Sequence, residues 1–219
     1  MRAVLLAVGL CGVAVAAAAD EAARWERVAE VLAERPEVTS LRARFVQEKF
    51  TPLLAEPIRS TGVVRSVDGW SRWDTQTPHA SVMLMGGGEL RLYYPEAQTL
   101  EVYDLDDGAM ALSAAASPDV ATLRDRFELA DLQQGNDGAL TLRLWPRGGT
   151  LAEAVEEVAV ELAAGGGLRS MAVTDADGET TATVFEDVEL NPGIEPEELE
   201  LELPAGTRVV RPLAGVGAG

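Results

Sequence analysis

Apolar residues near the start of the chain recur with the spacing of a helix. Between residues 21 and 35 they follow the pattern i, i+3, i+4, i+7, with charged residues between them: Trp25, Val28, Ala29 and Leu32. This spacing places the apolar side chains on one face of an α-helix. Pro36 ends the pattern, since a proline cannot continue a helix. The sequence therefore predicts an amphipathic helix over residues 21–35.

After this helix the apolar period falls to two, which is typical of β-strands. The change begins at Leu41, Ala43 and Phe45, which alternate with Arg42 and Arg44. Turn signals such as Asp-Gly and Gly-Gly-Gly separate the runs that follow. The further strands are expected over residues 60–66, 71–76, 80–85, 89–94, 100–105, 139–145, 155–162, 168–174, 180–190 and 198–203.

A second helical stretch is expected between residues 117 and 127. Ser117 fits an N-cap with Pro118 in the first helical position, and Leu123 and Phe127 share the apolar face with Val120. Short strands joined by hairpin turns form an antiparallel meander, and its apolar face needs a cover. The prediction is a mainly β (α+β) protein: a single curled antiparallel sheet that forms an incomplete barrel, with a helical lid or plug.

The N-terminus carries the features of an export signal. Arg2 precedes a short apolar run, and an alanine-rich stretch ends before Asp20. This predicts a signal peptide over residues 1–19, cleaved after Ala19. A retained membrane anchor is the alternative, disfavoured because the apolar run is short for a bilayer. A binding domain is then expected over residues 20–213, followed by a flexible Gly- and Ala-rich tail over 214–219.

The only cysteine, Cys11, lies inside the expected signal peptide and follows Leu10, whereas a lipoprotein signal requires a small residue there. We therefore expect neither a lipid anchor nor a disulfide in the exported chain. The chain has 18 Lys+Arg against 36 Asp+Glu, a formal net charge of −18. This acidity argues against nucleic acid as a partner and against an anionic membrane surface. The size and apolar content fit one domain, expected to be a monomer.

Two motifs raise the question of catalysis or metal binding. His79 is the only histidine, and the stretch Gly69–Trp73 breaks the Gly-x-Ser-x-Gly pattern at its last position. Residues 175–186 have the length of a calcium loop, but the alternation after Asp177-Gly178 favours a β-hairpin. We expect no catalytic residue, no metal site and no cofactor.

A curled sheet of this size leaves an apolar cavity beneath its helices, and a flexible acyl chain fits such a space. Met83 and Met85 suit it because methionine adapts to variable ligands. The alternative for each apolar residue is an ordinary place in the core. The candidate lipid-binding residues are Trp73, Val82, Leu84, Leu92, Tyr94, Leu123, Leu142, Leu144, Val173 and Phe185.

Several short motifs, in order, resemble the LolA family of periplasmic lipoprotein carriers. They run from the first strand to the end of the expected domain: Phe45-Val46-Gln47, Gly62, Arg72-Trp73, Pro78, Gly88-Glu-Leu-Arg-Leu-Tyr-Tyr-Pro95, Asp175-Ala-Asp-Gly178, Thr181, Phe185 and Leu201-Glu-Leu-Pro-Ala-Gly206. The resemblance implies an incomplete barrel whose cavity holds the acyl chains of lipoproteins. It further implies a periplasmic carrier, not an enzyme, that serves an inner-membrane exporter and an outer-membrane receptor. The family position matched by Trp73 looks into the cavity.

One departure from the family concerns the lid. Characterised carriers have an Arg-Pro pair shortly before the matched tryptophan, and its arginine ties barrel to lid; here the sequence reads Ser66-Val67-Asp68. Arg65 and Arg72 are the candidates for this lid contact. Two other functions for the same fold stay open: a carrier of free lipid or glycolipid, and an envelope-stress sensor that acts through protein contacts.

Overall fold

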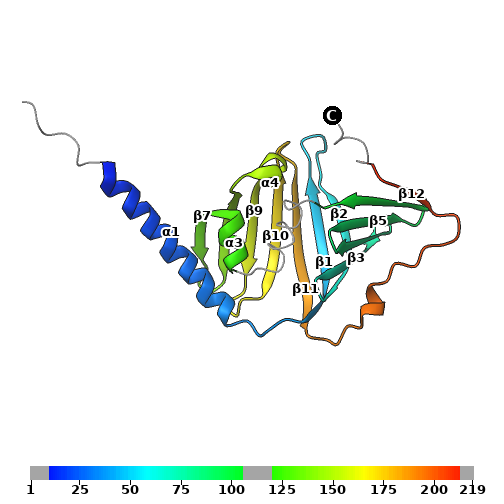
Figure 1. The fold of residues 1–219 in the computed structure, drawn as a ribbon, viewed down its shortest axis with the longest axis horizontal. Coiled ribbons are helices and arrows are strands. Elements are labelled where there is room, and N and C mark those ends of the chain that lie inside the picture. Colours follow the sequence, from blue (N-terminus) through cyan, green and yellow to red (C-terminus); the bar gives the residue numbers. More distant parts are fainter. Residues whose placement is uncertain (1–9, 106–119, 213–219) are drawn as a thin grey trace, which may run out of the picture.

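The computed structural model describes residues 10–105 and 120–212, which form one sheet with its longer helices on one side (Figure 1). The helices are α1 (Leu10–Ala33), α3 (Val120–Arg126), α4 (Gly149–Ala154) and the 3-10 turn η1 (Pro196–Leu199). The strands are β1 (Ser40–Phe50), β2 (Ile58–Val67), β3 (Trp70–Thr77), β4 (Ser81–Gly86), β5 (Glu89–Tyr94), β6 (Thr99–Asp104), β7 (Phe127–Gln134), β8 (Leu140–Pro146), β9 (Val155–Leu162), β10 (Leu168–Asp175), β11 (Thr180–Leu190) and β12 (Arg208–Val210).

The sheet consists of two meanders, β2–β6 and β7–β11, that meet on either side of β1, and it does not close into a barrel. Its twelve strands run in the order β12-β6-β5-β4-β3-β2-β1-β11-β10-β9-β8-β7, so β12 and β7 are free edges. The predicted mainly β fold with an incomplete barrel is therefore confirmed. The sheet is mixed rather than purely antiparallel, since the short edge strand β12 pairs with β6 in parallel.

One face of the sheet, which we call the inner face, carries α1 and α3. The burial pattern of β8 shows which side chains point to this face. Leu140, Leu142 and Leu144 are fully buried, whereas Arg143 and Trp145 point outward. These leucines form one core cluster with helix residues and with the inner residues of β7 and β9: Trp25, Val28, Leu123, Leu129, Val158 and Val160. The helices thus cover the β7–β10 half of the inner face.

The β1–β6 half has two smaller clusters on opposite faces. On the inner face, Ala43, Phe45 and Val64 pack together with Trp73 and Phe185. On the outer face, a cluster forms around three buried side chains, with Val82 and Leu201 packed against it: Tyr93, Leu100 and Val102. Residues 191–207, which we call the C-terminal strap, supply Leu201 to this outer cluster. Figure 1 shows the strap (orange to red) running along the outside of this half.

Helix α1 begins earlier than the hydrophobic spacing predicts and ends at Ala33, close to the expected end. From Asp20 onward, the first buried residue of α1 is Trp25, and Figure 1 shows the N-terminal turns of the helix extending beyond the sheet. The second helix starts at Val120, while the expected N-cap Ser117 and Pro118 lie outside the described residues, as does the 214–219 tail. Among the described helices, none has the length and apolarity needed to cross a bilayer.

Two predictions about strands were wrong. Phe127 opens β7 rather than ending a helix; a bulge between Leu129 and Asp131 breaks the alternation and hides this strand in the sequence. Residues 198–203 alternate Glu and Leu but pair with no strand. Instead, Leu199 and Leu201 turn toward the outer face of the sheet while the backbone runs across it as the strap.

Candidate functional site

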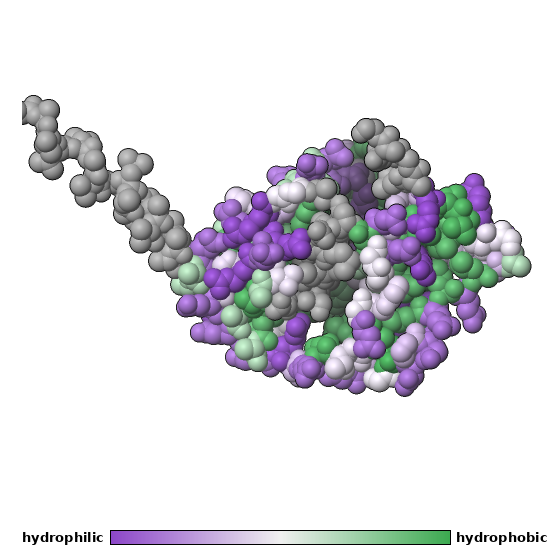
Figure 2. Space-filling view, in the orientation of Figure 1, coloured by the Kyte–Doolittle hydropathy of each residue, from purple (hydrophilic) through white to green (hydrophobic). Residues whose placement is uncertain are grey.

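A cavity of about 700 Å³ opens between the two halves of the sheet, on the inner face. Strands β1, β2, β3, β4 and β11 form its walls, and the α1–β1 connection, the β2–β3 turn and the β9–β10 turn form its mouth. Its apolar lining comprises Val38, Leu41, Ala43, Val64, Trp70, Trp73, Met85, Leu168, Phe185, Val188 and Leu190. Figure 2 shows green apolar surface inside the hollow, framed by purple residues. The volume falls within the range of small-ligand sites.

Three packed aromatic rings form what we call the aromatic floor: Trp73 and Phe185 line the cavity, and the buried ring of Phe45 packs against Trp73. The ring of Trp73 lies 5.1 Å from that of Phe45 and 5.9 Å from that of Phe185, in tilted and edge-on arrangements that aromatic pairs favour. Gly62 makes room for this stack: a Cβ at Gly62 would lie 2.7 Å from the Phe45 ring and 2.1 Å from the carbonyl oxygen of Asp74. The aromatic floor is therefore closely packed and largely apolar.

The mouth of the cavity is polar. Arg35, Asp68 and Arg169 line it together with serine and threonine side chains. Arg169 donates to the carboxylates of Asp137 at 2.8 Å and Glu161 at 3.4 Å, and this guanidinium holds the pKa of Asp137 below its ordinary value. An amphiphile fits this arrangement with its apolar part on the aromatic floor and its polar part at the mouth.

The structure brings two of the ten candidate lipid-binding residues to the cavity, Trp73 and Phe185. Four others, Leu123, Leu142, Leu144 and Val173, belong to the cluster packed beneath the helices. Their place is in or against the core of the β7–β10 half.

The remaining four candidates lie on β4 and β5. Leu92 and Tyr94 point to the inner face beyond the cavity; burial and the nearby Glu101 charge raise the pKa of Tyr94. Val82 and Leu84 point to the outer face, since Met83 and Met85 take the inner positions of β4. Met85 lines the cavity.

Several cavity residues escaped the sequence reasoning. Leu41, Ala43 and Val64 stand beside Trp73 in the strand register, since Ala43 pairs with Val64 and Val64 with Trp73. These positions can be found by taking the partners of Trp73 on the adjacent strands and then every second residue along each strand, because such residues share a face. Val38 and Leu168, which lie in or next to connections at the mouth, have no such signal.

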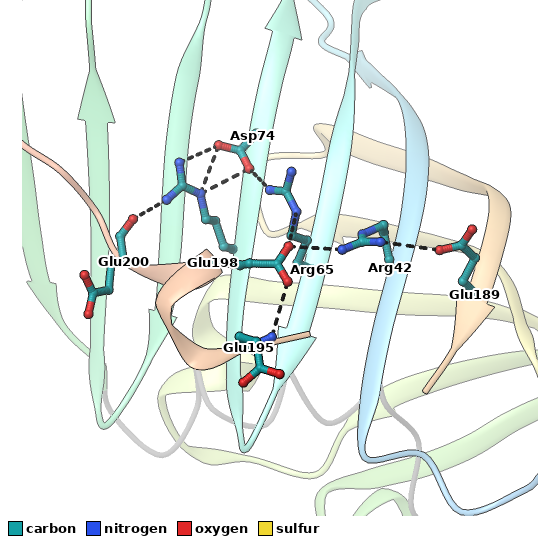
Figure 3. Close-up of polar contacts among 8 residues, drawn as sticks. Arg42, Arg65, Asp74, Glu189, Glu195, Glu198 and Glu200 are labelled. Atoms are coloured by element: carbon teal, nitrogen blue, oxygen red, sulfur yellow. Dashed lines mark hydrogen bonds and ion pairs between the residues drawn. The ribbon is translucent and has the colours of Figure 1, made fainter. Parts of the chain in front are cut away.

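The two candidate lid arginines pair with each other across β2 and β3 and point to the outer face, opposite Trp73. Figure 3 shows Arg65 next to Glu198 of the C-terminal strap. Arg65 and Arg72 both bind the carboxylate of Asp74, at 2.6 Å and 2.9 Å. Arg72 also donates to the carbonyl oxygen of Glu200 in the strap, and Arg65 lies 3.9 Å from the Glu198 carboxylate. Through these contacts both arginines connect the sheet to the strap.

The motifs considered for catalysis or metal binding lie in turns and at exposed positions. The imidazole of His79 is 81% exposed and lies 3.7 Å from Glu96. Asp175 accepts the backbone N–H groups of Asp177 and Glu179, closing the predicted β10–β11 hairpin. Within the described ranges no three His, Cys, Asp or Glu side chains gather as a metal site requires.

Fold and cavity together define an incomplete β-barrel protein with a largely apolar pocket on the inner face of its sheet. Residues 36–200 match the family described as "Outer membrane lipoprotein carrier protein LolA", and the chain belongs to this family. The predicted family resemblance is confirmed.

Individual relatives are distant. A protein from Dechloromonas aromatica (strain RCB), named outer-membrane lipoprotein carrier protein, is 27% identical over 172 residues, which cover 78% of this chain and 81% of the relative. One of the same name from Chromohalobacter salexigens is 28% identical over 147 residues, covering 65% and 66%. A crystal structure of a DUF1329 family protein from Desulfovibrio piger ATCC 29098 superposes with a TM-score of 0.52 at 9% identity, covering 82% of this chain and 97% of that one, and shares the fold.

Proposed function

We propose that this protein is a periplasmic carrier that binds the acyl chains of lipoproteins in its inner cavity and moves them from the inner to the outer membrane. The observation that carries the proposal is the 700 Å³ apolar cavity in a chain of the LolA family. The names of its relatives support the choice of cargo.

The chemistry of the cavity suits an acyl chain. Each methylene moved from water to an apolar site contributes ~0.8 kcal/mol, so a long chain gains enough to offset its loss of freedom. Trp73 and Phe185 offer an apolar surface that the buried Phe45 supports, and the side chain of Met85 adapts to chains of different shape. Such binding requires neither a cofactor nor a catalytic residue.

The wider setting is part of the same proposal. Residues 1–19 would serve as a signal peptide that is removed on export, and the carrier would act as a monomer between an inner-membrane exporter and an outer-membrane receptor. A carrier of free lipid or glycolipid is the second candidate. It is favoured because Arg65 and Arg72 hold the C-terminal strap on the outer face, whereas the arginine of characterised carriers ties the barrel to the lid.

The proposal is tested by the variant Trp73→Glu. The ring of Trp73 packs against Phe45 and Phe185, so a carboxylate at this position enters apolar surroundings, and burying an unpaired charge is costly. We expect binding of a fluorescent acyl probe to fall at least ~100-fold, in line with a penalty of several kcal/mol. Leu53→Glu places the same charge at a side chain that is 88% exposed and serves as the control, with unchanged binding expected.

Circular dichroism establishes that each variant is folded before its affinity is compared, and Trp73→Phe, which keeps an aromatic ring, should retain most of the binding. Equal affinity of Trp73→Glu and the parent protein would remove Trp73 from the site and the inner cavity from the proposal.

A further inference from the structure

A second apolar groove lies on the outer face of the sheet, between β2–β5 and the C-terminal strap. Its volume is about 390 Å³. Val67, Trp70 and Leu84 form the sheet side of this outer groove, and Leu199 and Leu201 form the strap side. Leu84 and Leu199 are 5% and 6% exposed, so the groove has a packed apolar base.

The outer groove and the inner cavity meet at the β2–β3 turn. Asp68 and Trp70 line both. The indole of Trp70 lies against the backbone of Gly86 and Gly87, where an added Cβ would come within 2.4 Å and 3.0 Å of its ring atoms. Trp70 is thereby held in place as a wall that both apolar spaces share.

The strap that forms the roof of the outer groove is tied down at several points. Arg72 donates to the carbonyl oxygen of Glu200, and Arg42 donates to the Glu198 carboxylate at 3.0 Å (Figure 3). That carboxylate also accepts the backbone N–H of Glu195 at 3.2 Å, which closes the turn of η1. Leu199 and Leu201 are therefore presented to the sheet by a fixed segment, and the groove is a built part of the fold.

We propose that the ligand of this protein has two acyl chains and straddles the β2–β3 turn, with one chain in the inner cavity and the other in the outer groove. The inference rests on the proposed function, because it takes the inner cavity as the first acyl site. The shared wall of Asp68 and Trp70 brings the two spaces close enough for two chains joined at one head.

The surroundings of the turn define the head of this ligand. Asp68 and Glu200 supply negative charge, while Arg35 in the cavity mouth and Arg91 in the outer groove, which pairs with Glu89 at 2.7 Å, supply positive charge. Because both signs are present, a neutral or zwitterionic head fits better than one with several charges of one sign. The ligand class is thus a two-chain amphiphile whose head carries little net charge.

The test uses phosphatidylcholine with a photoreactive group in one chain, and lysophosphatidylcholine with the same group in its single chain. After irradiation, the labelled residues of the mature protein are mapped by mass spectrometry. The two-chain lipid is expected to label both the strap, at Leu199 or Leu201, and the inner cavity, at Ala43 or Phe185. Because a second linked chain binds at high effective concentration, its affinity should exceed that of the one-chain lipid by at least ~10-fold.

A pair of variants tests the outer groove alone. Leu201→Glu places a charge in the groove, whereas Leu203→Glu places it two residues further along the strap, where the side chain is 40% exposed. Leu201→Glu should lower two-chain affinity to the level of the one-chain lipid and leave one-chain binding, which also reports a folded protein, unchanged. Leu203→Glu should leave both unchanged.

Two results have distinct meanings. If the two-chain lipid labels only the inner cavity and gains no affinity, the outer groove is no acyl site, while the proposed carrier function stands. If neither lipid labels the inner cavity, the proposed function itself fails and this inference with it. Labelling of the parent protein decides between these outcomes even if a variant does not fold.

Discussion

At the scale of single residues, the aromatic floor depends on the absence of one side chain. Phe45 can lie against β2 only because residue 62 is glycine, and Trp73 then packs on Phe45 from β3. The Gly62 and Trp73 motifs of the sequence are thus two parts of one packing arrangement. Its geometry follows from the strand register, which places Phe45 opposite Gly62.

Gly62→Ala should destabilise the protein. The new Cβ would lie 2.1 Å from the carbonyl oxygen of Asp74 and 2.7 Å from the Phe45 ring, so backbone and ring must both move. We expect a loss of ~1–3 kcal/mol in the free energy of unfolding, the usual cost of overpacking. Urea denaturation measures it, with Gly165→Ala as the control, because a Cβ there meets nothing within 4 Å. An equal effect of both substitutions would contradict this account of the floor.

At the scale of elements, alternation in the sequence predicts most strands because one face of each is buried. The regular pattern of β8 and β9 shows this directly, with buried and outward residues alternating. The same rule misses β7, where a bulge shifts the pattern by one residue. It also mistakes the strap for a strand, since Leu199 and Leu201 are turned inward without backbone pairing.

The candidate site was harder to predict than the fold. Hydrophobicity alone does not tell which face of a strand meets a helix and which meets a cavity. Leu142 and Trp73 both point to the inner face, yet only Trp73 reaches the cavity, because α1 and α3 cover the part of the sheet that holds Leu142. That distinction depends on where the helices lie along the sheet, which periodicity does not encode.

An ion pair between β8 and β9 gives the protein a pH-dependent contribution. Arg143 binds Glu157 with nitrogen–oxygen distances of 2.6 and 3.0 Å, and Trp145 donates to the same carboxylate at 3.2 Å. The hydrogen bonds from Arg143, and a weaker contribution from Trp145, hold the pKa of Glu157 below its ordinary 4.5, against the effect of burial. A carboxyl with a lowered folded-state pKa stabilises fully above its unfolded pKa, and that stability is lost as the pH falls through the folded pKa.

Glu157→Gln should therefore reduce the free energy of unfolding at pH 7 by up to ~1 kcal/mol, the upper end for a partly exposed pair. The difference from the parent protein should shrink as the pH is lowered below 4.5, where the parent's own carboxylate becomes protonated. Denaturation across this pH range measures it, with the exposed neighbour Glu156→Gln as the control for charge. A difference that stays constant down to strongly acidic pH would count against the ion pair.

At the scale of the whole molecule, the expected mature chain carries its own core contacts in α1. Trp25 and Val28 are buried, and Glu21 accepts a hydrogen bond from Arg147 at 2.9 Å. Removal of residues 1–19 leaves these contacts in place. What remains is a sheet with apolar space on both faces of its β1–β6 half.

Cleavage after Ala19 predicts that the chain recovered from the periplasm of a Gram-negative host begins at Asp20. N-terminal sequencing and intact mass measure this directly. A chain that keeps its first 19 residues and pellets with the membrane would support the anchor alternative and contradict export as a soluble carrier.

Native mass spectrometry of the protein, purified gently from the periplasm, tests the central claim most directly. If the protein carries lipoproteins, a fraction of its molecules should appear with one acylated protein bound. The Trp73→Glu variant, purified in the same way, should lack this bound species. Bound lipid without protein would point to the lipid or glycolipid carrier instead. A protein that is empty, and that stays empty when acyl probes are added, would contradict the account of the inner cavity and favour a sensor acting through protein contacts.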